Sequence, residues 1–287
     1  TTGTIYKSLD ESQYDNDGEV YYFAGNPTDN WVQFGGYWWR IIRINGNGSI
    51  RMIYQGTSAN TTGEGTQIGT SAFNTNYNDN AYVGYMYGTP GSSTYETTHA
   101  NTNDSAIKQR LDEWYTNESN LINYSQFLDE NSEFCGDRQP STSSNSINNS
   151  GGTGSIDTYY GAHIRLFTNV KPTFKCLDEK DLYTVIESSQ GNKALTYPIG
   201  LITADELAYA GGSWTTGNAS YYLYTNQYYW TMTPYRYGNV FTMASYGLIN
   251  GSGENYTYGI RPVINLKSNV TLTGSGTTTD PYKVEGA

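Results

Sequence analysis

The chain has 287 residues, of which 36% are hydrophobic, and it carries a formal net charge of −11 at pH 7. Only 16 Lys and Arg residues stand against 27 Asp and Glu, and they form no basic run, which argues against nucleic acid as a partner. No apolar run approaches the roughly 18 residues of a membrane span. The 29 Tyr and 6 Trp residues supply apolar area for a core. The surplus of Tyr, Asn, Thr, Ser and Gly is typical of secreted and cell-surface proteins.

The N-terminal segment, residues 1–19, is polar and rich in Asp. It shows neither an initiator Met nor a signal peptide, so we expect it to be a linker from a removed leader or anchor of an extracellular, surface-displayed protein. Residues 15–19 (Asp-Asn-Asp-Gly-Glu) resemble part of a calcium loop. The acidic ligand at position 12 and the flanking helices of such a loop are missing, which favours a solvated turn. We expect neither a metal nor another cofactor.

A β-hairpin is predicted over residues 36–54. Two runs of aromatic and β-branched residues flank the Asn45-Gly46 turn, which is a strong hairpin signal. Both faces of the first run are largely apolar, because Trp38 and Trp39 point to opposite sides. This pattern indicates a central strand that is covered on both faces.

Two helices are predicted. Over residues 101–115, Ile107, Leu111 and Trp114 recur at helical spacing behind capping Asn and Asp residues. The second helix begins at Thr203, where Thr-Ala-Asp-Glu forms a capping box, and the Gly-Gly pair at residues 211–212 ends it.

Cys135 and Cys176 are the two cysteines of the chain. They form no Cys-x-x-Cys pair, and with only 2 His residues a zinc site is nearly excluded. In a secreted protein two such cysteines favour a disulfide, which closes a loop of roughly 40 residues and is worth about 2–4 kcal/mol.

The C-terminal third alternates between two kinds of segment. Residues 229–233, 240–243 and 259–266 are apolar and strand-like. Residues 235–239 and 244–258 between them are mostly Tyr, Asn, Ser, Gly and Thr. Tyrosine offers large rigid contact area and Ser, Gly and Asn offer adaptable hydrogen bonds, which is the chemistry of binding loops.

Five motifs follow one another along roughly residues 20–266: Trp-Trp-Arg at residues 38–40, Ser-Ala-Ile-Lys at 105–108, Leu-Ile-Thr-Ala-Asp-Glu at 201–206, Trp-Thr-Met-Thr-Pro at 230–234 and Gly-Ile-Arg-Pro-Val at 259–263. In this order they resemble a C-type-lectin-like domain of bacterial surface proteins. That branch is related to the sulfatase-modifying (formylglycine-generating) fold, to the variable proteins of diversity-generating retroelements and to pilin-like surface proteins of gut Firmicutes. The resemblance implies an α+β domain with a small twisted antiparallel sheet, two helices and long loops. We expect one such domain over residues 20–287, in which residues 273–284 themselves predict a turn followed by a short terminal strand.

The same resemblance implies a non-catalytic, adhesin-type binding protein, with retroelement-diversified loops as one variant, whose C-terminal loops bind a protein or a glycan. The Glu-Pro-Asn, Gln-Pro-Asp and Trp-Asn-Asp motifs of calcium-dependent lectins are missing. A formylglycine-generating or glycan-acting enzyme is one alternative, although no cysteine follows Cys176, where that enzyme has a reactive pair. A pilin-like structural subunit is the other alternative.

The candidate ligand-binding residues lie in the turn-rich C-terminal segments, and we expect the loops to converge on one exposed surface. They are Trp214, Tyr235, Arg236, Tyr237, Asn239, Ser245, Tyr246, Asn250, Ser252, Asn255 and Tyr256.

Other candidate groups point to structure more than to chemistry. Arg40, Arg43 and Arg261 lie in strand-like segments and could bind an anion, but a structural role with buried carboxylates or carbonyls is the expected one. His99 and His163 have no Ser or Cys at a suggestive spacing, so we predict no catalytic residues. The tryptophans expected in the core are Trp38, Trp39, Trp114 and Trp230.

Overall fold

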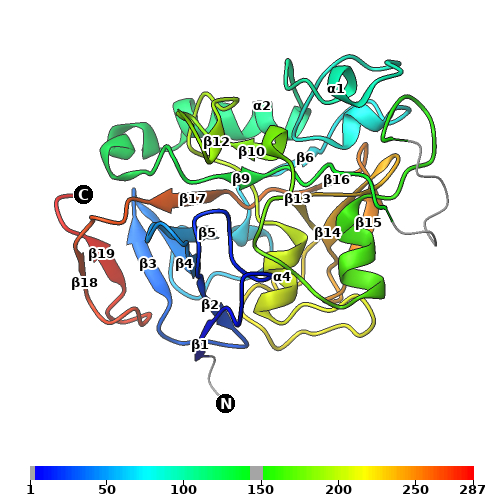
Figure 1. Ribbon diagram of the computed structural model, residues 1–287. Helices are drawn as coiled ribbons and strands as arrows, with labels where there is room; N and C mark the ends of the chain where they lie inside the picture. The colour runs from blue at the N-terminus through cyan, green and yellow to red at the C-terminus, as the bar shows by residue number, and fades with distance from the viewer. Residues whose placement is uncertain (1–3, 143–150) are drawn as a thin grey trace.

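The computed structural model describes residues 4–142 and 151–287 (Figure 1). The architecture is mixed α+β, with many strands, few helices and a curled main sheet. Eight strands form the larger sheet: β1 (Thr4–Lys7), β2 (Tyr21–Ala24), β3 (Trp31–Phe34), β4 (Tyr37–Ile44), β5 (Ile50–Gly56), β17 (Val263–Leu266), β18 (Leu272–Thr273) and β19 (Tyr282–Val284). Five strands form the second sheet: β6 (Thr70–Ala72), β13 (Tyr229–Arg236), β14 (Asn239–Met243), β15 (Ile249–Gly253) and β16 (Thr257–Gly259).

Short elements connect the two sheets. Three two-stranded ribbons pair β7 (Met86–Tyr87) with β8 (Asn103–Asp104), β9 (Phe134–Cys135) with β10 (Leu182–Tyr183), and β11 (Glu187–Ser188) with β12 (Gly191–Asn192). The α-helices are α1 (Tyr95–Thr98), α2 (Ala106–Glu113), α3 (Gly161–His163) and α4 (Ala204–Ala210). None of the helices in the described ranges is long and apolar enough to cross a membrane.

The predicted hairpin is confirmed as β4 and β5, and β17, which lies within the predicted strand 259–266, pairs antiparallel with β5. Most pairings are antiparallel as expected, but β13 with β16 and β19 with β3 are parallel. One hydrophobic core joins both halves of the chain, from Phe23 to Val284. Trp39, Trp114 and Trp230 lie in this core, whereas Trp38 is only half-buried.

The helices follow their capping signals with one difference. Thr203 and Glu206 form the predicted capping box at the start of α4, and Gly211 ends that helix at a φ of 121°. The predicted helix over residues 101–115 begins only at Ala106, because Asn103 and Asp104 pair with β7. The side chain of Ser105 caps it instead, accepting a hydrogen bond from the Lys108 amide.

The segment expected to be a linker is part of the larger sheet at residues 4–7. Strand β1 pairs with β2 along its full length. Asp15 is only 4% exposed, and its carboxylate accepts hydrogen bonds from Arg43 and from the Gly46 amide. The expectation of a solvated turn at residues 15–19 is therefore wrong for Asp15, because the hairpin places a buried cation beside it.

Helix α4 lies between the two sheets, where it contacts β2 on one side and β13, β14 and β15 on the other (Figure 1). Its buried Glu206 accepts a hydrogen bond from Arg43 Nε at 2.9 Å and forms an ion pair with Arg51, whose Nε lies 2.6 Å from the same carboxylate oxygen. The expected structural role is therefore confirmed for Arg43.

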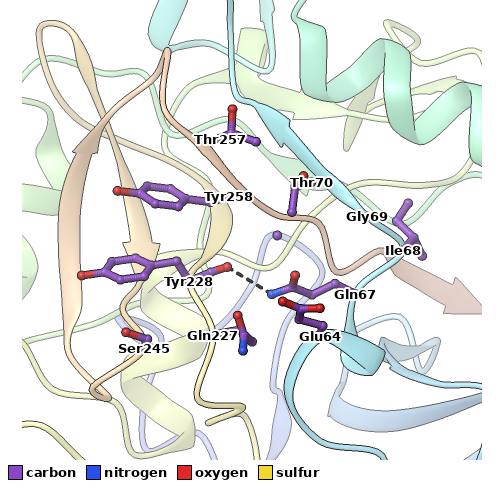
Figure 2. Close-up of a pocket in the computed structure, with 11 residues that line it drawn as sticks. Glu64, Gln67, Ile68, Gly69, Thr70, Gln227, Tyr228, Ser245, Thr257 and Tyr258 are labelled. Atoms are coloured by element: carbon purple, nitrogen blue, oxygen red, sulfur yellow. Dashed lines mark hydrogen bonds between the residues drawn. The ribbon is translucent and has the colours of Figure 1, made fainter.

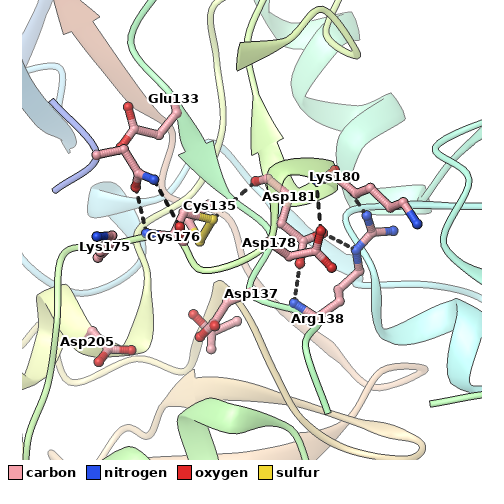
Figure 3. The surroundings of a disulfide bond; sticks show 12 residues. Glu133, Cys135, Asp137, Arg138, Lys175, Cys176, Asp178, Lys180, Asp181 and Asp205 are labelled. Atoms are coloured by element: carbon pink, nitrogen blue, oxygen red, sulfur yellow. Dashed lines mark hydrogen bonds and ion pairs between the residues drawn. A yellow bond between two sulfur atoms is a disulfide. The ribbon is translucent and has the colours of Figure 1, made fainter. Parts of the chain in front are cut away.

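The predicted disulfide between Cys135 and Cys176 is present, with the two Cα atoms 5.5 Å apart. Figure 3 shows it beside the fully buried ion pair of Arg138 and Asp181. The Arg138 guanidinium also donates to the Met86 carbonyl. The bond and the ion pair together tie residues 135–138 to residues 176–181.

Candidate functional site

The second sheet separates the predicted binding residues onto two faces. On β15, Gly251 packs directly against the Tyr235 ring. Asn250 is its neighbour in the strand and points to the opposite face, where its amide lies 3.4 Å from the Tyr246 hydroxyl. The expectation of one surface holding Tyr235, Tyr237, Tyr246 and Asn250 is thus wrong.

Strand pairing also places the two turns of this sheet at opposite ends. Asn239 pairs with Gly253 at one end of β14 and β15, and Met243 pairs with Ile249 at the other. Tyr237 lies beyond the first end, whereas Tyr246 lies beyond the second. An antiparallel meander places successive connections at opposite ends of the strands, so these two turns lie apart.

Four tyrosines form a continuous row on one face of the second sheet. Tyr228 and Tyr258 stack with ring centroids 4.7 Å apart and planes inclined by 16°. Tyr246 meets Tyr228 at 6.1 Å, and Tyr256 meets Tyr258 at 6.2 Å. Tyr246 and Tyr256 are exposed by 51% and 57%, so the row offers aromatic surface to solvent along its length.

An open cleft of about 640 Å³ lies beside this row, and we call it the tyrosine cleft. Figure 2 shows the stacked rings of Tyr228 and Tyr258 along one side, with the Glu64 and Gln67 side chains across from them. Gln67 Nε2 donates to the Tyr228 carbonyl at 3.1 Å, which fixes the two walls relative to each other. The other lining residues are Ile68, Gly69, Thr70, Gln227, Ser245, Thr257 and Gly259.

The tyrosine cleft offers neutral hydrogen-bonding groups next to flat rings. Burial, together with the hydroxyl of Tyr246, raises the pKa of Tyr228 to about 12, so its hydroxyl stays protonated at neutral pH. A protonated hydroxyl both donates and accepts, and the Gln227 amide does the same. Glu64 adds one exposed carboxylate. This set suits a polar, uncharged ligand with one flat apolar side.

The opposite face of the sheet carries Tyr235 and Trp214. Phe167 joins them, because it stacks on Trp214 at 4.5 Å and meets Tyr235 at 5.5 Å. His163 lies in the same cluster, 4.9 Å from the Tyr235 ring. Burial lowers the pKa of His163 to about 4, so it is neutral at physiological pH. Trp214 lines an apolar hollow of about 320 Å³ together with residues that include Leu166.

The remaining predicted residues occupy several places. Arg236, Tyr237 and Asn239 are half-buried around the first turn, where the Tyr237 amide donates to the Thr158 carbonyl. Ser252 is buried and lies 3.1 Å from Thr242, so it belongs to the interior. Of the predicted set, the structure brings Ser245, Tyr246, Asn250 and Tyr256 to the face of the tyrosine cleft.

Of the residues that line the tyrosine cleft, sequence reasoning named only Ser245 and missed the others, among them Glu64, Gln67, Tyr228 and Tyr258. The two tyrosines directly border predicted strands, and their alternation with buried Tyr229 and Gly259 was a usable signal. Glu64 and Gln67 carried no such signal, because residues 64–70 meet the C-terminal strands only through tertiary contacts such as the pairing of β16 with β6.

Neither histidine is placed for chemistry with a nucleophile. His99 is fully buried with its Nε2 3.0 Å from the Gly152 carbonyl oxygen, and burial holds its pKa well below the usual value. Both cysteines are joined in the disulfide. Across residues 4–142 and 151–287, no three His, Cys, Asp or Glu side chains are grouped so that they could hold a metal ion.

Comparisons with known proteins add no relative. No family model matches the chain, and no curated protein and no solved structure matches it either. The resemblance to C-type-lectin-like domains therefore stays a prediction from the sequence.

Proposed function

We propose that this protein is a non-catalytic, adhesin-type binding protein with a C-type-lectin-like fold, displayed outside the cell, whose tyrosine cleft binds a neutral glycan. The observation that supports this proposal most strongly is the row of four tyrosines that borders the tyrosine cleft. Exposed aromatic groups in a cluster mark interaction surfaces. Sugar rings pack flat faces on aromatic rings and offer hydroxyls to amides, which is the combination present here. The disulfide is compatible with the oxidising environment outside the cell.

The test is binding to a printed glycan array by the wild-type protein and by a Tyr228→Ala/Tyr246→Ala double variant. The double variant should lose binding while its thermal midpoint stays within a few degrees of wild type. Tyr6→Ala is the matched control, because Tyr6 is 48% exposed, close to the 51% of Tyr246, and lies on the edge strand β1. Glycan binding that survives the double variant, or is lost equally in the control, would contradict the proposal.

A protein ligand is the alternative for the same face, since Tyr246 and Tyr256 together resemble the exposed anchors of protein interfaces. If the folded wild-type protein binds none of the glycans on the array, this alternative is favoured. The triple change of Tyr235, Tyr237 and Tyr246 is a poorer test, because Tyr235 packs on Phe241 at 5.1 Å and its loss would disturb the core.

A further inference from the structure

Two buried arginines differ from the other buried arginines in having no carboxylate partner among the described residues. Arg40 is 5% exposed and Arg261 is fully buried. Arg40 donates to Asn30 Oδ1 at 2.6 Å and to the Pro27 carbonyl at 2.7 Å. Among the described residues, Arg261 donates only to uncharged acceptors. These are the Tyr54 and Leu223 carbonyls and Gln55 Oε1. Their positive charge is therefore not neutralised by a direct ion pair.

Arg40 borders a pocket of about 380 Å³, which is within the range of small-ligand sites. Its guanidinium is held between two rings, 4.1 Å from the Trp31 centroid and 5.0 Å from the Tyr222 centroid. A guanidinium has five N–H donors, and within the described ranges the Nη1 group of Arg40 has no acceptor. The two rings thus fix the orientation of the guanidinium, and its Nη1 group remains available as a donor to a ligand.

A second donor lines the same pocket. Tyr222 is 5% exposed, and its hydroxyl has no hydrogen-bond partner among the described residues. An unmade hydrogen bond of a buried hydroxyl costs about 1–3 kcal/mol, so such groups are normally bound by water or a ligand. Burial raises the pKa of the Tyr222 hydroxyl, which keeps it protonated as a donor.

The electrostatics of the pocket favour an anion. Burial, with repulsion from Arg261 as a further cause, lowers the pKa of Arg40 to about 10, which still leaves it charged at neutral pH. Asp29 is exposed and its charge reaches Arg40, but it forms no ion pair with it. A bound carboxylate would supply the missing partner, and charge-assisted bonds from Arg and Tyr are the strong ones.

We propose that this pocket binds the carboxylate of an acidic sugar, with Arg40 and Tyr222 as the donors to the anion. The rim supports a sugar over a peptide terminus, because it presents several neutral hydroxyl and amide groups that complement ring hydroxyls. These are Asn26, Thr28, Asn60, Thr61, Thr62 and Thr278. The pocket is distinct from the tyrosine cleft, and residues 60–67 run between the two, held by the bond from the Gly63 amide to the Thr225 carbonyl.

The test measures binding of three probes by ligand-observed NMR and calorimetry: D-glucuronate, D-glucose and N-acetylglycine. D-Glucuronate should bind about 10-fold or more tightly than D-glucose, which lacks the anion, and more tightly than N-acetylglycine, which lacks the hydroxyls. Failure of wild-type protein to bind D-glucuronate at millimolar concentration overturns the proposal. If N-acetylglycine binds with the same affinity as D-glucuronate, the sugar assignment is overturned in favour of a peptide carboxylate.

Tyr222→Phe is the decisive variant, because it removes a hydroxyl that has no hydrogen-bond partner among the described residues and so leaves folding intact. It should weaken D-glucuronate binding by about 10-fold, the worth of one hydrogen bond to a charged group. Tyr224→Phe is the matched control, since its hydroxyl is already bonded to the Ser245 carbonyl. Unchanged affinity in Tyr222→Phe overturns the assignment. Tyr228→Ala should leave D-glucuronate binding unaltered, which separates this site from the tyrosine cleft.

Discussion

Buried charge is handled differently in two regions of this molecule. Around α4 and the disulfide, each buried arginine meets a carboxylate: Arg43 and Arg51 share Glu206, and Arg138 binds Asp181. Around the pocket of Arg40 the buried arginines donate, among the described residues, only to neutral groups. A buried charge without a counter-ion is costly, so the arginines of the first region find their counter-ions within the protein whereas those of the second have capacity for a ligand.

The two open clefts are neighbours. The tyrosine cleft and the Arg40 pocket both border residues 60–67, and the Tyr222 hydroxyl in the Arg40 pocket has no hydrogen-bond partner among the described residues. Satisfied networks fix a fold, and unsatisfied groups mark places where a water or a ligand can be bound. The comparison predicts that substitutions at the ion-paired arginines cause large losses of stability, whereas substitutions around the two clefts cause small ones.

The largest effect is expected from Arg138→Leu. It leaves the fully buried Asp181 without its cation, which should lower the free energy of unfolding by about 3–5 kcal/mol. Denaturant titration measures this loss. Arg110→Leu is the control, because its pair with Glu118 is partly exposed and should contribute less than about 1 kcal/mol. Equal losses in the two variants would remove the distinction between the regions.

Removal of the disulfide should have the next largest effect. The Cys135→Ser/Cys176→Ser double variant frees a connection that spans 41 residues, which should cost about 2–4 kcal/mol of unfolding free energy. Glycan binding at the distant tyrosine cleft should persist at temperatures where the variant is folded. Thiol titration of the denatured, unreduced wild type should find no free thiol, and two free thiols would contradict the bond.

A smaller effect of opposite sign is expected from Glu254→Gln. Glu254 is fully buried and neither carboxyl oxygen has a hydrogen-bond partner within the described ranges. Burial raises its pKa to about 8, compared with about 4.3 in an unfolded chain. The folded state therefore holds the proton between these values, and the stability contributed by this group is lost as pH rises from about 4 to 8.

Glu254→Gln should accordingly stabilise the protein by roughly 1–3 kcal/mol at pH 9 relative to wild type and change little at pH 4. Thermal unfolding across this pH range is the measurement. Glu179→Gln, at an exposed carboxylate, serves as the control and should leave the profile unchanged. A wild-type profile without a decline between pH 5 and pH 8 would show that Glu254 has a partner in solution.

The smallest effect on stability is expected at the exposed end of the tyrosine row. Tyr256→Ala removes a ring that is 57% exposed, so the free energy of unfolding should change by less than about 0.5 kcal/mol. Glycan affinity should fall several-fold, because the row loses one end of its aromatic surface. A large loss of stability would place Tyr256 in the core and weaken the proposed role of the row.

Local signals were sufficient for several elements. The Asn45-Gly46 turn and its flanking runs predicted the hairpin, and the Thr203 capping box predicted the start of α4. The helix α2 began later than predicted, because a two-residue pairing with β7 used Asn103 and Asp104. Local propensity cannot reveal such a competitor, since the partner strand lies about 17 residues away in sequence.

The sequence by itself determined the mixed α+β class, the disulfide and the C-terminal segments that combine strands with tyrosine-rich turns, because each depends on neighbouring residues or on the two cysteines alone. Only the tertiary structure decided which tyrosines share a surface and which arginines lack a carboxylate. Those facts depend on the sheet: alternation along β15 sends Asn250 and Gly251 to opposite faces. The pairing of β16 with β6 brings Gln67 to Tyr228 across 161 positions of chain.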